Sequence, residues 1–189
     1  MMVLGIAGSP RRGGNTDILL AEVLRGAASR GATVKTIVLS DLHIDPCLHC
    51  DACLKAGQCR IDDDMQQVYR DLREADRIVL AAPIHFLGVP AQTKAMIDRF
   101  QAFWALKYVL KLPPLGDKRE RKGLFVSVGG RSEPNVFEPA IAMVKLVFRT
   151  LDVAYAGELL FPGIDEKGVV SKNADALEQA YLAGQRLAE

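Results

Sequence analysis

Short apolar runs alternate with helical patterns along the whole chain, and this alternation constrains the fold more than any other feature. The first run, residues 2–8, is continuously apolar and ends in glycine, as expected of a strand buried on both faces. From Thr16 onward, apolar residues recur at helical spacing until Gly31, a residue type that often ends helices. The pattern then repeats, with strands predicted at 33–40, 77–83, 122–130 and 153–161 and helices at 62–75, 90–104, 138–152 and 172–189.

Strands that alternate with helices form βαβ units, whose right-handed crossovers build a parallel sheet with helices on both faces. The five strands and five helices predict a doubly wound α/β fold of the flavodoxin-like kind, with strand order 2-1-3-4-5. The 189 residues fit a single domain, 1–189. A proline-broken, charged insert at 107–122 is predicted to be an exposed loop before the fourth strand.

The composition argues against several classes of partner. The chain has 24 basic and 23 acidic side chains, so its net charge of +1 gives no reason to expect nucleic acid or an anionic membrane. Its apolar runs are too short to span a bilayer, and its N-terminus lacks the features of a signal peptide. A cytoplasmic location is therefore expected. In that reducing compartment clustered cysteines favour metal or redox roles over a structural disulfide.

The segment 8–16, "GSPRRGGNT", lies between the first strand and the first helix. In doubly wound sheets this turn presents free backbone N–H groups and a helix dipole to an anion. The P-loop lysine is missing, since Gly14 occupies its position, and there is no dinucleotide fingerprint. A single phosphate monoester is the predicted guest, and an ordinary glycine-rich turn is the alternative. The predicted contacts are Ser9, Arg11, Gly14, Asn15 and Thr16.

The third and fourth strands end in "PIHFLGVP" and "SVGGRSE", which the strand order places beside the phosphate turn. These loops offer backbone hydrogen-bonding groups, flat side chains and glycines against which a planar ring can lie. A phosphate site next to a planar slot predicts FMN. The predicted ring contacts are Pro83, Ile84, His85, Phe86, Leu87, Gly88, Ser127, Gly129 and Gly130.

All four cysteines fall within 46–60, in the pattern C-x2-C-x2-C-x5-C. Zinc sites usually use two separated knuckles, whereas closely spaced cysteines can wrap a compact iron–sulfur cluster. Four alternatives remain open: a [4Fe–4S] cluster, free thiols, zinc, and a disulfide. The segment follows the second strand and is expected at the same rim of the sheet as the flavin. The candidate ligands are Cys47, Cys50, Cys53 and Cys59.

As a set, "GSPRRGGNT", "PCLHCDACLKAGQCRIDDDM" and "APIHFLGVPAQTKAMIDRF" resemble the iron–sulfur flavoproteins and the related NAD(P)H-dependent FMN reductases. The resemblance implies FMN held by the three loops, a cluster on the four cysteines, and a homodimer or homotetramer. Two features depart from it: relatives often carry tyrosine where His85 stands, and the 107–122 insert is longer than a minimal member needs.

The leading hypothesis is an FMN-dependent oxidoreductase that exchanges electrons with a [4Fe–4S] cluster. It would link a two-electron donor such as NAD(P)H to a one-electron partner such as ferredoxin, and the cofactors would carry the chemistry, so no catalytic side chain is assigned. The alternatives are a cluster-free NAD(P)H-dependent FMN or quinone reductase, a flavodoxin-like electron carrier, and a flavin-free domain with a zinc-stabilised surface. An apolar group of Phe86, Phe103 and Trp104 near the rim is expected to contribute to a subunit interface.

Overall fold

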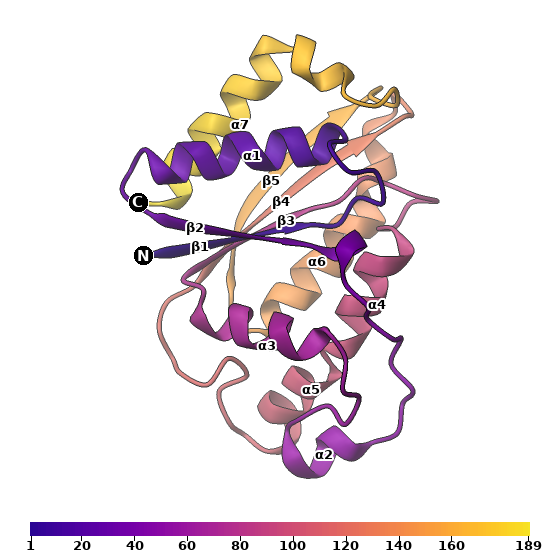
Figure 1. Ribbon diagram of the computed structural model, residues 1–189, viewed down its shortest axis with the longest axis vertical. Coiled ribbons are helices and arrows are strands. Elements are labelled where there is room, and N and C mark those ends of the chain that lie inside the picture. The colour runs from indigo at the N-terminus through magenta and orange to yellow at the C-terminus, as the bar shows by residue number, and fades with distance from the viewer.

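The computed structural model describes residues 1–189 and, apart from that of Pro134, their side chains. Five parallel strands form one sheet in the order β2-β1-β3-β4-β5, which confirms the predicted doubly wound, flavodoxin-like fold (Figure 1). The strands are β1 (Met2–Ala7), β2 (Thr33–Val38), β3 (Arg77–Ala81), β4 (Lys122–Gly129) and β5 (Ala154–Pro162).

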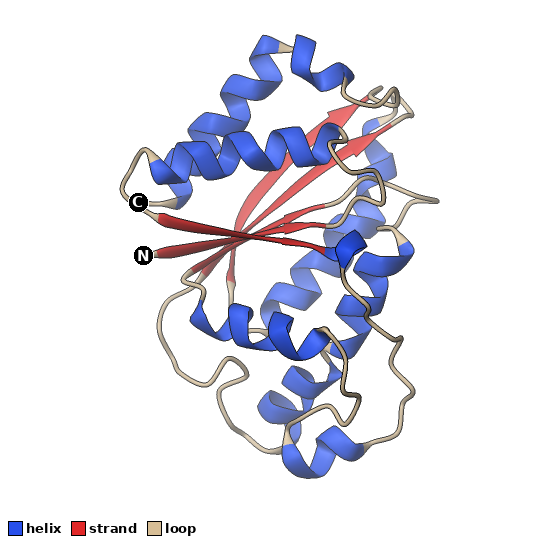
Figure 2. Cartoon of the chain, viewed as in Figure 1, coloured by secondary structure: helices blue, strands red, loops and turns tan.

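Helices cover both faces of the sheet, with α1 and α7 on one face and α3, α4, α5 and α6 on the other (Figures 1 and 2). The α-helices are α1 (Asn15–Ala28), α2 (Ala52–Ala56), α3 (Met65–Glu74), α4 (Ala91–Arg99), α5 (Gln101–Trp104), α6 (Glu138–Thr150) and α7 (Ala174–Leu187). Shorter turns are the 3-10 helices η1 (Leu39–Asp41), η3 (Pro134–Phe137) and η4 (Val169–Lys172) and the π-helical turn η2 (Ala105–Val109).

Burial follows from the place of each strand in the sheet. All residues of β3 are buried because this central strand has a neighbour on each side and helices on both faces, which explains its continuous apolar sequence. The edge strand β2 is largely exposed, in agreement with its alternating sequence. Two apolar cores result, one on each face of the sheet.

Two predicted elements differ from the structure. The helix predicted at 90–104 is broken at Phe100 into α4 and α5, and the chain continues through η2 to Val109. The break follows Arg99, whose fully buried side chain has its partners in residues 45–63, a long-range requirement that helical spacing does not report.

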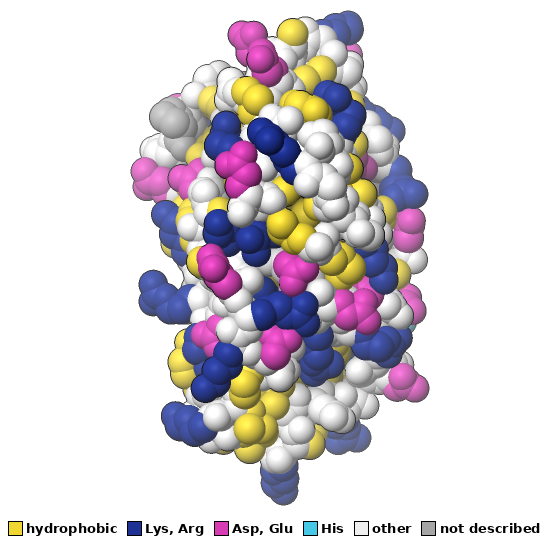
Figure 3. All heavy atoms as spheres, turned by 90° about the vertical axis from the view of Figure 1, so that its left-hand side faces the viewer, with side chains coloured by type: hydrophobic (Ala, Val, Ile, Leu, Met, Phe, Trp, Pro, Cys, Tyr) yellow, Lys and Arg dark blue, Asp and Glu magenta, His cyan; other side chains and the backbone are white. Residues whose placement is uncertain are grey.

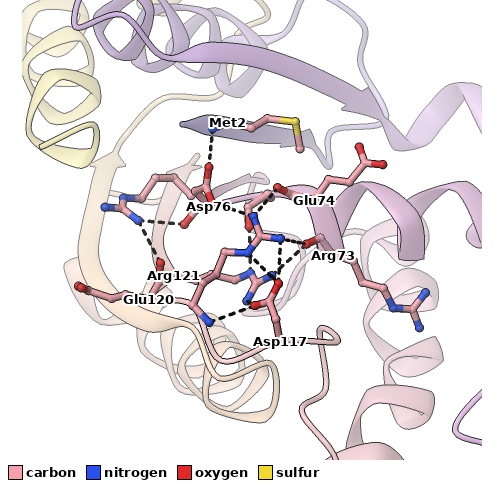
Figure 4. Close-up of polar contacts among 10 residues, drawn as sticks. Met2, Arg73, Glu74, Asp76, Asp117, Glu120 and Arg121 are labelled. Carbon is pink, nitrogen blue, oxygen red and sulfur yellow. Dashed lines mark hydrogen bonds and ion pairs between the residues drawn. The ribbon is translucent and has the colours of Figure 1, made fainter.

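The 107–122 insert was predicted to be an exposed loop, and most of its residues are exposed or half-buried without regular structure, but it is fastened to the fold at a few buried residues. Its start lies in η2, and Leu115 and Arg121 are only 2% and 3% exposed. Arg121 donates to the carbonyl oxygens of Arg73 and Ala75 and to the carboxylate of Asp117 (Figure 4). These bonds fasten the insert at the amino ends of the strands. Basic and acidic side chains are interspersed over that face (Figure 3).

None of the helices described in the structure is both long and apolar enough to cross a membrane.

Candidate functional site

A hollow opens at the carboxyl ends of β1, β3 and β4, where the loops that follow these strands meet. The loops after β1 and β3 emerge at the right-hand end of the sheet in Figure 1, opposite the two termini. This position is the topological switch point, where doubly wound sheets bind their ligands. Nine of the predicted residues line the hollow, namely Ser9, Arg11, Gly14, Asn15, Thr16, Pro83, Ile84, His85 and Gly130.

The N-terminus of α1 forms one wall of this hollow and suits an anion. Its N-cap, Gly14, provides no side-chain cap, and the first N–H groups of a helix have no partner within the helix. The Thr16 hydroxyl is buried and has no hydrogen-bond partner among the described residues. Gly13 N–H donates to Asp17, and burial raises the pKa of that carboxyl. The wall therefore offers donors that a phosphate would satisfy.

Two cations reach the same wall. Arg11 and Lys167 line the hollow, and neither forms an ion pair with any residue that the structure describes. The Arg11 guanidinium is held near the hollow by a 3.3 Å hydrogen bond to the carbonyl oxygen of Asp165. The backbone of the turn is fixed by Ser9, whose hydroxyl accepts from the Arg11 N–H at 3.0 Å. The turn is thus preformed, with positive charge beside the helix terminus.

Asn15 has a structural role beside its place in the wall. Its amide donates to the Glu166 carbonyl oxygen at 2.9 Å and accepts from the Val170 N–H at 3.1 Å. The side chain is therefore engaged with the segment after β5 and is not free to cap α1. These bonds bring residues 164–170 against the phosphate turn.

Five predicted contacts do not line the hollow. The Ser127 side chain is fully buried and donates to the Ala82 carbonyl oxygen at 2.8 Å, so it joins β4 to the end of β3. Gly129 is buried in β4, and its carbonyl accepts from the Ile164 N–H. The remaining three, Phe86, Leu87 and Gly88, belong to a tight turn beyond the hollow.

That turn is closed by two hydrogen bonds between the backbones of His85 and Gly88, at 2.8 and 3.0 Å. Phe86 and Leu87 at its tip have φ of 48° and 65°, a left-handed conformation that costs non-glycine residues energy. Both side chains are exposed, Phe86 fully so. In this structure Phe86 therefore forms an apolar projection beside the hollow rather than part of its wall.

The loop after β5 contributes to the hollow as well, although none of its residues was among the predicted contacts. Ile164, Asp165 and Lys167 line the hollow together with Pro10 and Val128. Ligands bind beyond the carboxyl ends of parallel strands, and β5 is one of these strands. This rule could have pointed to the loop after β5 as part of the site. No local motif marks this loop.

A second hollow is lined by all four cysteines, so the structure brings together the predicted ligand set. Cys50 is exposed and the other three are partly buried, and all four are free thiols. Burial raises the pKa of the Cys53 thiol, and the nearby Cys59, Cys47 and Cys50 raise it further, as expected for thiols that share one site. The two hollows have no lining residue in common.

The cysteine segment leaves the rim of the sheet after β2, as predicted, but it then runs outward to α2, away from the phosphate turn (Figure 1). The rest of its hollow is formed by Ile61 and by Arg99, Gln101 and Ala102 of the α4–α5 region. His49 lines the hollow too, and its side chain is 88% exposed. In the described part of the chain, no three His, Cys, Asp or Glu side chains converge closely enough to hold one metal ion.

A buried ion pair lies behind the cysteines. Arg99 and Asp63 are 0% and 2% exposed in their side chains and approach to 2.6 Å. Burial acts to lower the pKa of Arg99, but the bond to Asp63, with smaller contributions from Cys59 and Tyr69, raises it overall. Burial likewise acts to raise the pKa of Asp63, and the Arg99 bond and backbone N–H groups outweigh it, so that pKa is lowered. Both groups are therefore charged at neutral pH.

The strand order and the phosphate-ready turn at the switch point define a flavodoxin-like α/β protein of the mononucleotide-binding type. Residues 1–155 match the family described as NADPH-dependent FMN reductase. The chain belongs to that family, and the predicted family resemblance is confirmed.

Individual relatives extend this finding. The chain is 41% identical over 129 residues to an iron–sulfur flavoprotein of Archaeoglobus fulgidus and 37% identical over 130 residues to one of Methanosarcina thermophila. These matches cover 68% and 69% of the chain, but only 62% and 64% of the two relatives, so the chain spans less than two thirds of their length. Among solved structures, the NAD(P)H:quinone oxidoreductase of Methanothermobacter marburgensis superposes with a TM-score of 0.75 at 18% identity, over 100% of this chain and 96% of that one. At that identity the likeness supports the fold alone.

Proposed function

We propose that the protein is an FMN-dependent oxidoreductase that also carries a [4Fe–4S] cluster on its four cysteines. The observation that carries the flavin part is the buried hydroxyl of Thr16, a residue that lines the hollow at the switch point, since this hydroxyl has no partner among the described residues at the N-terminus of α1. Family membership and the two iron–sulfur flavoprotein relatives support the same assignment.

Different segments of the chain would bind the phosphate and the ring of FMN. The N-terminus of α1, the Thr16 hydroxyl and the Arg11 guanidinium would bind the phosphate. The backbone of 83–85 on one side and of 128–130 on the other would bind and orient the flat ring. FMN, when bound, supplies both one-electron and two-electron transfer. The exposed Phe86–Leu87 turn is suited to limit access of water to the ring.

The four cysteines would act as the cluster ligands. A four-iron cube takes one thiolate on each iron, so its ligands surround a hollow instead of converging on one point. The arrangement of Cys47, Cys50, Cys53 and Cys59 around a common hollow supports this ligand set. The cluster, when bound, passes single electrons. With both groups the protein would connect NAD(P)H, a two-electron donor, to a one-electron partner such as ferredoxin.

We further propose that the protein works as a homodimer or homotetramer. The hollows for the flavin and the cluster have separate linings in one chain, so a neighbouring subunit offers a route between them. Phe86 and Trp104 are 106% and 40% exposed, which supports an interface, whereas Phe103 is fully buried and belongs to the core. We also propose a reducing, cytoplasmic setting, in which clustered cysteines remain available as ligands.

The test is a measurement of FMN, iron and acid-labile sulfide per chain on protein purified without oxygen. Flavin together with about four irons per chain is the expected result. Flavin without iron would favour a cluster-free reductase or an electron carrier, and turnover with NAD(P)H separates those two. Absence of flavin, after incubation with excess FMN, would refute the proposal.

A further inference from the structure

Arg99 is an arginine enclosed by the protein at the end of α4, 1% exposed. One terminal nitrogen donates to the Asp45 carbonyl oxygen at 2.9 Å, and the other approaches the Ile61 carbonyl oxygen at 3.3 Å. Both terminal nitrogens also donate to the Asp63 carboxylate, at 2.6 and 3.0 Å. The guanidinium therefore binds three residues that are distant from α4 in the sequence.

These partners flank the cysteines. Asp45 lies two residues before the first cysteine, and Ile61 lies two residues after the last one. The Asp63 carboxylate also accepts the Asp45 N–H at 2.9 Å, so the pair of Arg99 and Asp63 binds both backbone groups of Asp45. One ion pair thus joins the two ends of the segment that holds all four thiols.

One donor of this guanidinium remains unused. The Arg99 Nε–H is buried and has no acceptor among the described residues. Buried donors are nearly always paired, because an unpaired one loses its hydrogen bond to water without replacement. Arg99 itself lines the cysteine hollow. Both terminal nitrogens are already bonded to residues 45, 61 and 63, so Nε–H is the donor left for an added acceptor.

We propose that Arg99 is the positioning residue of the cysteine site: it fixes both ends of the ligand segment and donates its Nε–H to a sulfur of the group bound there. This inference rests on the proposed function, because it takes an anionic thiolate-bound cluster as the occupant. Four thiolates around a doubly positive cube leave two net negative charges, and uptake of one electron adds a third. A fixed positive charge and a hydrogen bond to sulfur favour the more negative state, so Arg99 raises the reduction potential of the site.

The test uses anaerobic protein with its cluster in place and compares reduction potentials by titration with a one-electron reductant. Arg99→Gln removes the charge and is expected to disfavour the reduced state about tenfold or more, a shift of about 59 mV to lower potential. Arg99→Lys keeps the charge without the planar fork and is expected to shift the potential less. Asp63→Asn leaves Arg99 charged but removes the neighbouring negative charge, so the potential is expected to rise.

Arg121→Gln is the matched control. Arg121 is also buried, also pairs with a carboxylate and also binds carbonyl oxygens, but the described hydrogen bonds of its side chain go only to residues 73, 75 and 117. It is expected to lower the melting temperature as Arg99→Gln does and to leave the potential unchanged. A structural role alone would not separate these two variants.

Opposite shifts in Arg99→Gln and Asp63→Asn, with none in Arg121→Gln, are the expected pattern. Equal potentials in all variants would overturn the inference, and so would shifts in the same direction in Arg99→Gln and Asp63→Asn. Neither result would contradict the cluster assignment. If Arg99→Gln loses its iron or does not fold, the other two variants decide the test. The inference then requires a lower potential in Arg99→Lys and a higher potential in Asp63→Asn, each relative to wild type. Wild-type protein without iron and sulfide would overturn both the inference and the cluster part of the proposed function.

Discussion

Replacing Thr16 with valine should strengthen the apoprotein and weaken FMN binding, two effects of opposite sign from one substitution. Thr16 is 1% exposed at the start of α1, and its hydroxyl has no partner among the described residues. Valine has nearly the same shape and a similar helix propensity, so the exchange removes the hydroxyl with little other change. The substitution therefore reports what the hydroxyl contributes to the free energy of the apoprotein and, separately, to the free energy of FMN binding.

The magnitudes follow from the hydrogen-bond balance. A buried hydroxyl without a partner costs about 1–3 kcal/mol, so Thr16→Val should raise the free energy of unfolding of the apoprotein by about 1 kcal/mol. For a chain of this size that corresponds to about 2–4 °C in Tm. In the FMN complex the same hydroxyl would donate to a phosphate oxygen, and a hydrogen bond to a charged group contributes about 1.5–3 kcal/mol. FMN affinity should therefore fall by about ten- to one-hundred-fold.

The assay compares thermal unfolding of the apoproteins and the Kd for FMN and for riboflavin, which lacks the phosphate. Thr93→Val is the matched control, because Thr93 is equally buried but its hydroxyl donates to the Gly8 carbonyl oxygen at 2.9 Å. That variant should lose about 1 kcal/mol of apoprotein stability. Riboflavin affinity should be the same in wild type and Thr16→Val.

If Thr16→Val destabilises the apoprotein as much as Thr93→Val does, the Thr16 hydroxyl has a partner in the apoprotein and the predicted gain in stability is refuted. If Thr16→Val binds FMN as tightly as wild type, the predicted contact between this hydroxyl and the phosphate is refuted. If Thr16→Val lost FMN affinity and riboflavin affinity equally, the lost contact would be one to the flavin ring and not one to the phosphate.

Three further predictions concern the cysteine site. Cys50→Ala should sharply lower iron and sulfide per chain while FMN stays bound, because the two hollows share no residue; equal iron in both proteins would contradict the cluster assignment. Gly57→Ala should lower the free energy of unfolding by about 1–2 kcal/mol, because alanine is strained in the left-handed conformation of this residue. A further loss is expected because the new methyl group would lie 2.4 Å from Leu106 Cδ2. Gly116→Ala is the control, because Gly116 has φ of 91° and open space around it. In thermal unfolding it should show only the cost of the backbone strain, and its iron content should not change. Because the folded-state pKa of Asp63 is lowered, its stabilisation is present above the ordinary carboxyl value of 3.8 and is lost as the pH falls below it. Acid unfolding of Asp63→Asn should therefore be less steep than that of wild type, and an unchanged curve would contradict the ion pair's contribution.

The sequence by itself determined the architecture and the location of the sites along the chain. Alternating apolar runs and helical spacing predicted all five strands, because burial on both faces of a parallel sheet leaves a local pattern, and the doubly wound class to which this alternation points predicted their order. The same order placed the 8–16 turn and the loops after β3 and β4 at one edge, where Thr16 and His85 do line a common hollow. The cysteine spacing likewise predicted a shared site, since thiols a few residues apart can hardly lie far from one another.

Only the tertiary structure decided which side chains face these sites. Ser127 turns to the Ala82 carbonyl, and Lys167 arrives from a loop that no local motif marks. Arg99 resembles any charged residue near a helix end, yet it is buried behind the cysteines by partners more than thirty residues away. Periodicity reports how a residue relates to its near neighbours along the chain. The direction of a side chain and the partner of a buried charge depend on packing between distant segments, so they become defined only when the chain is folded.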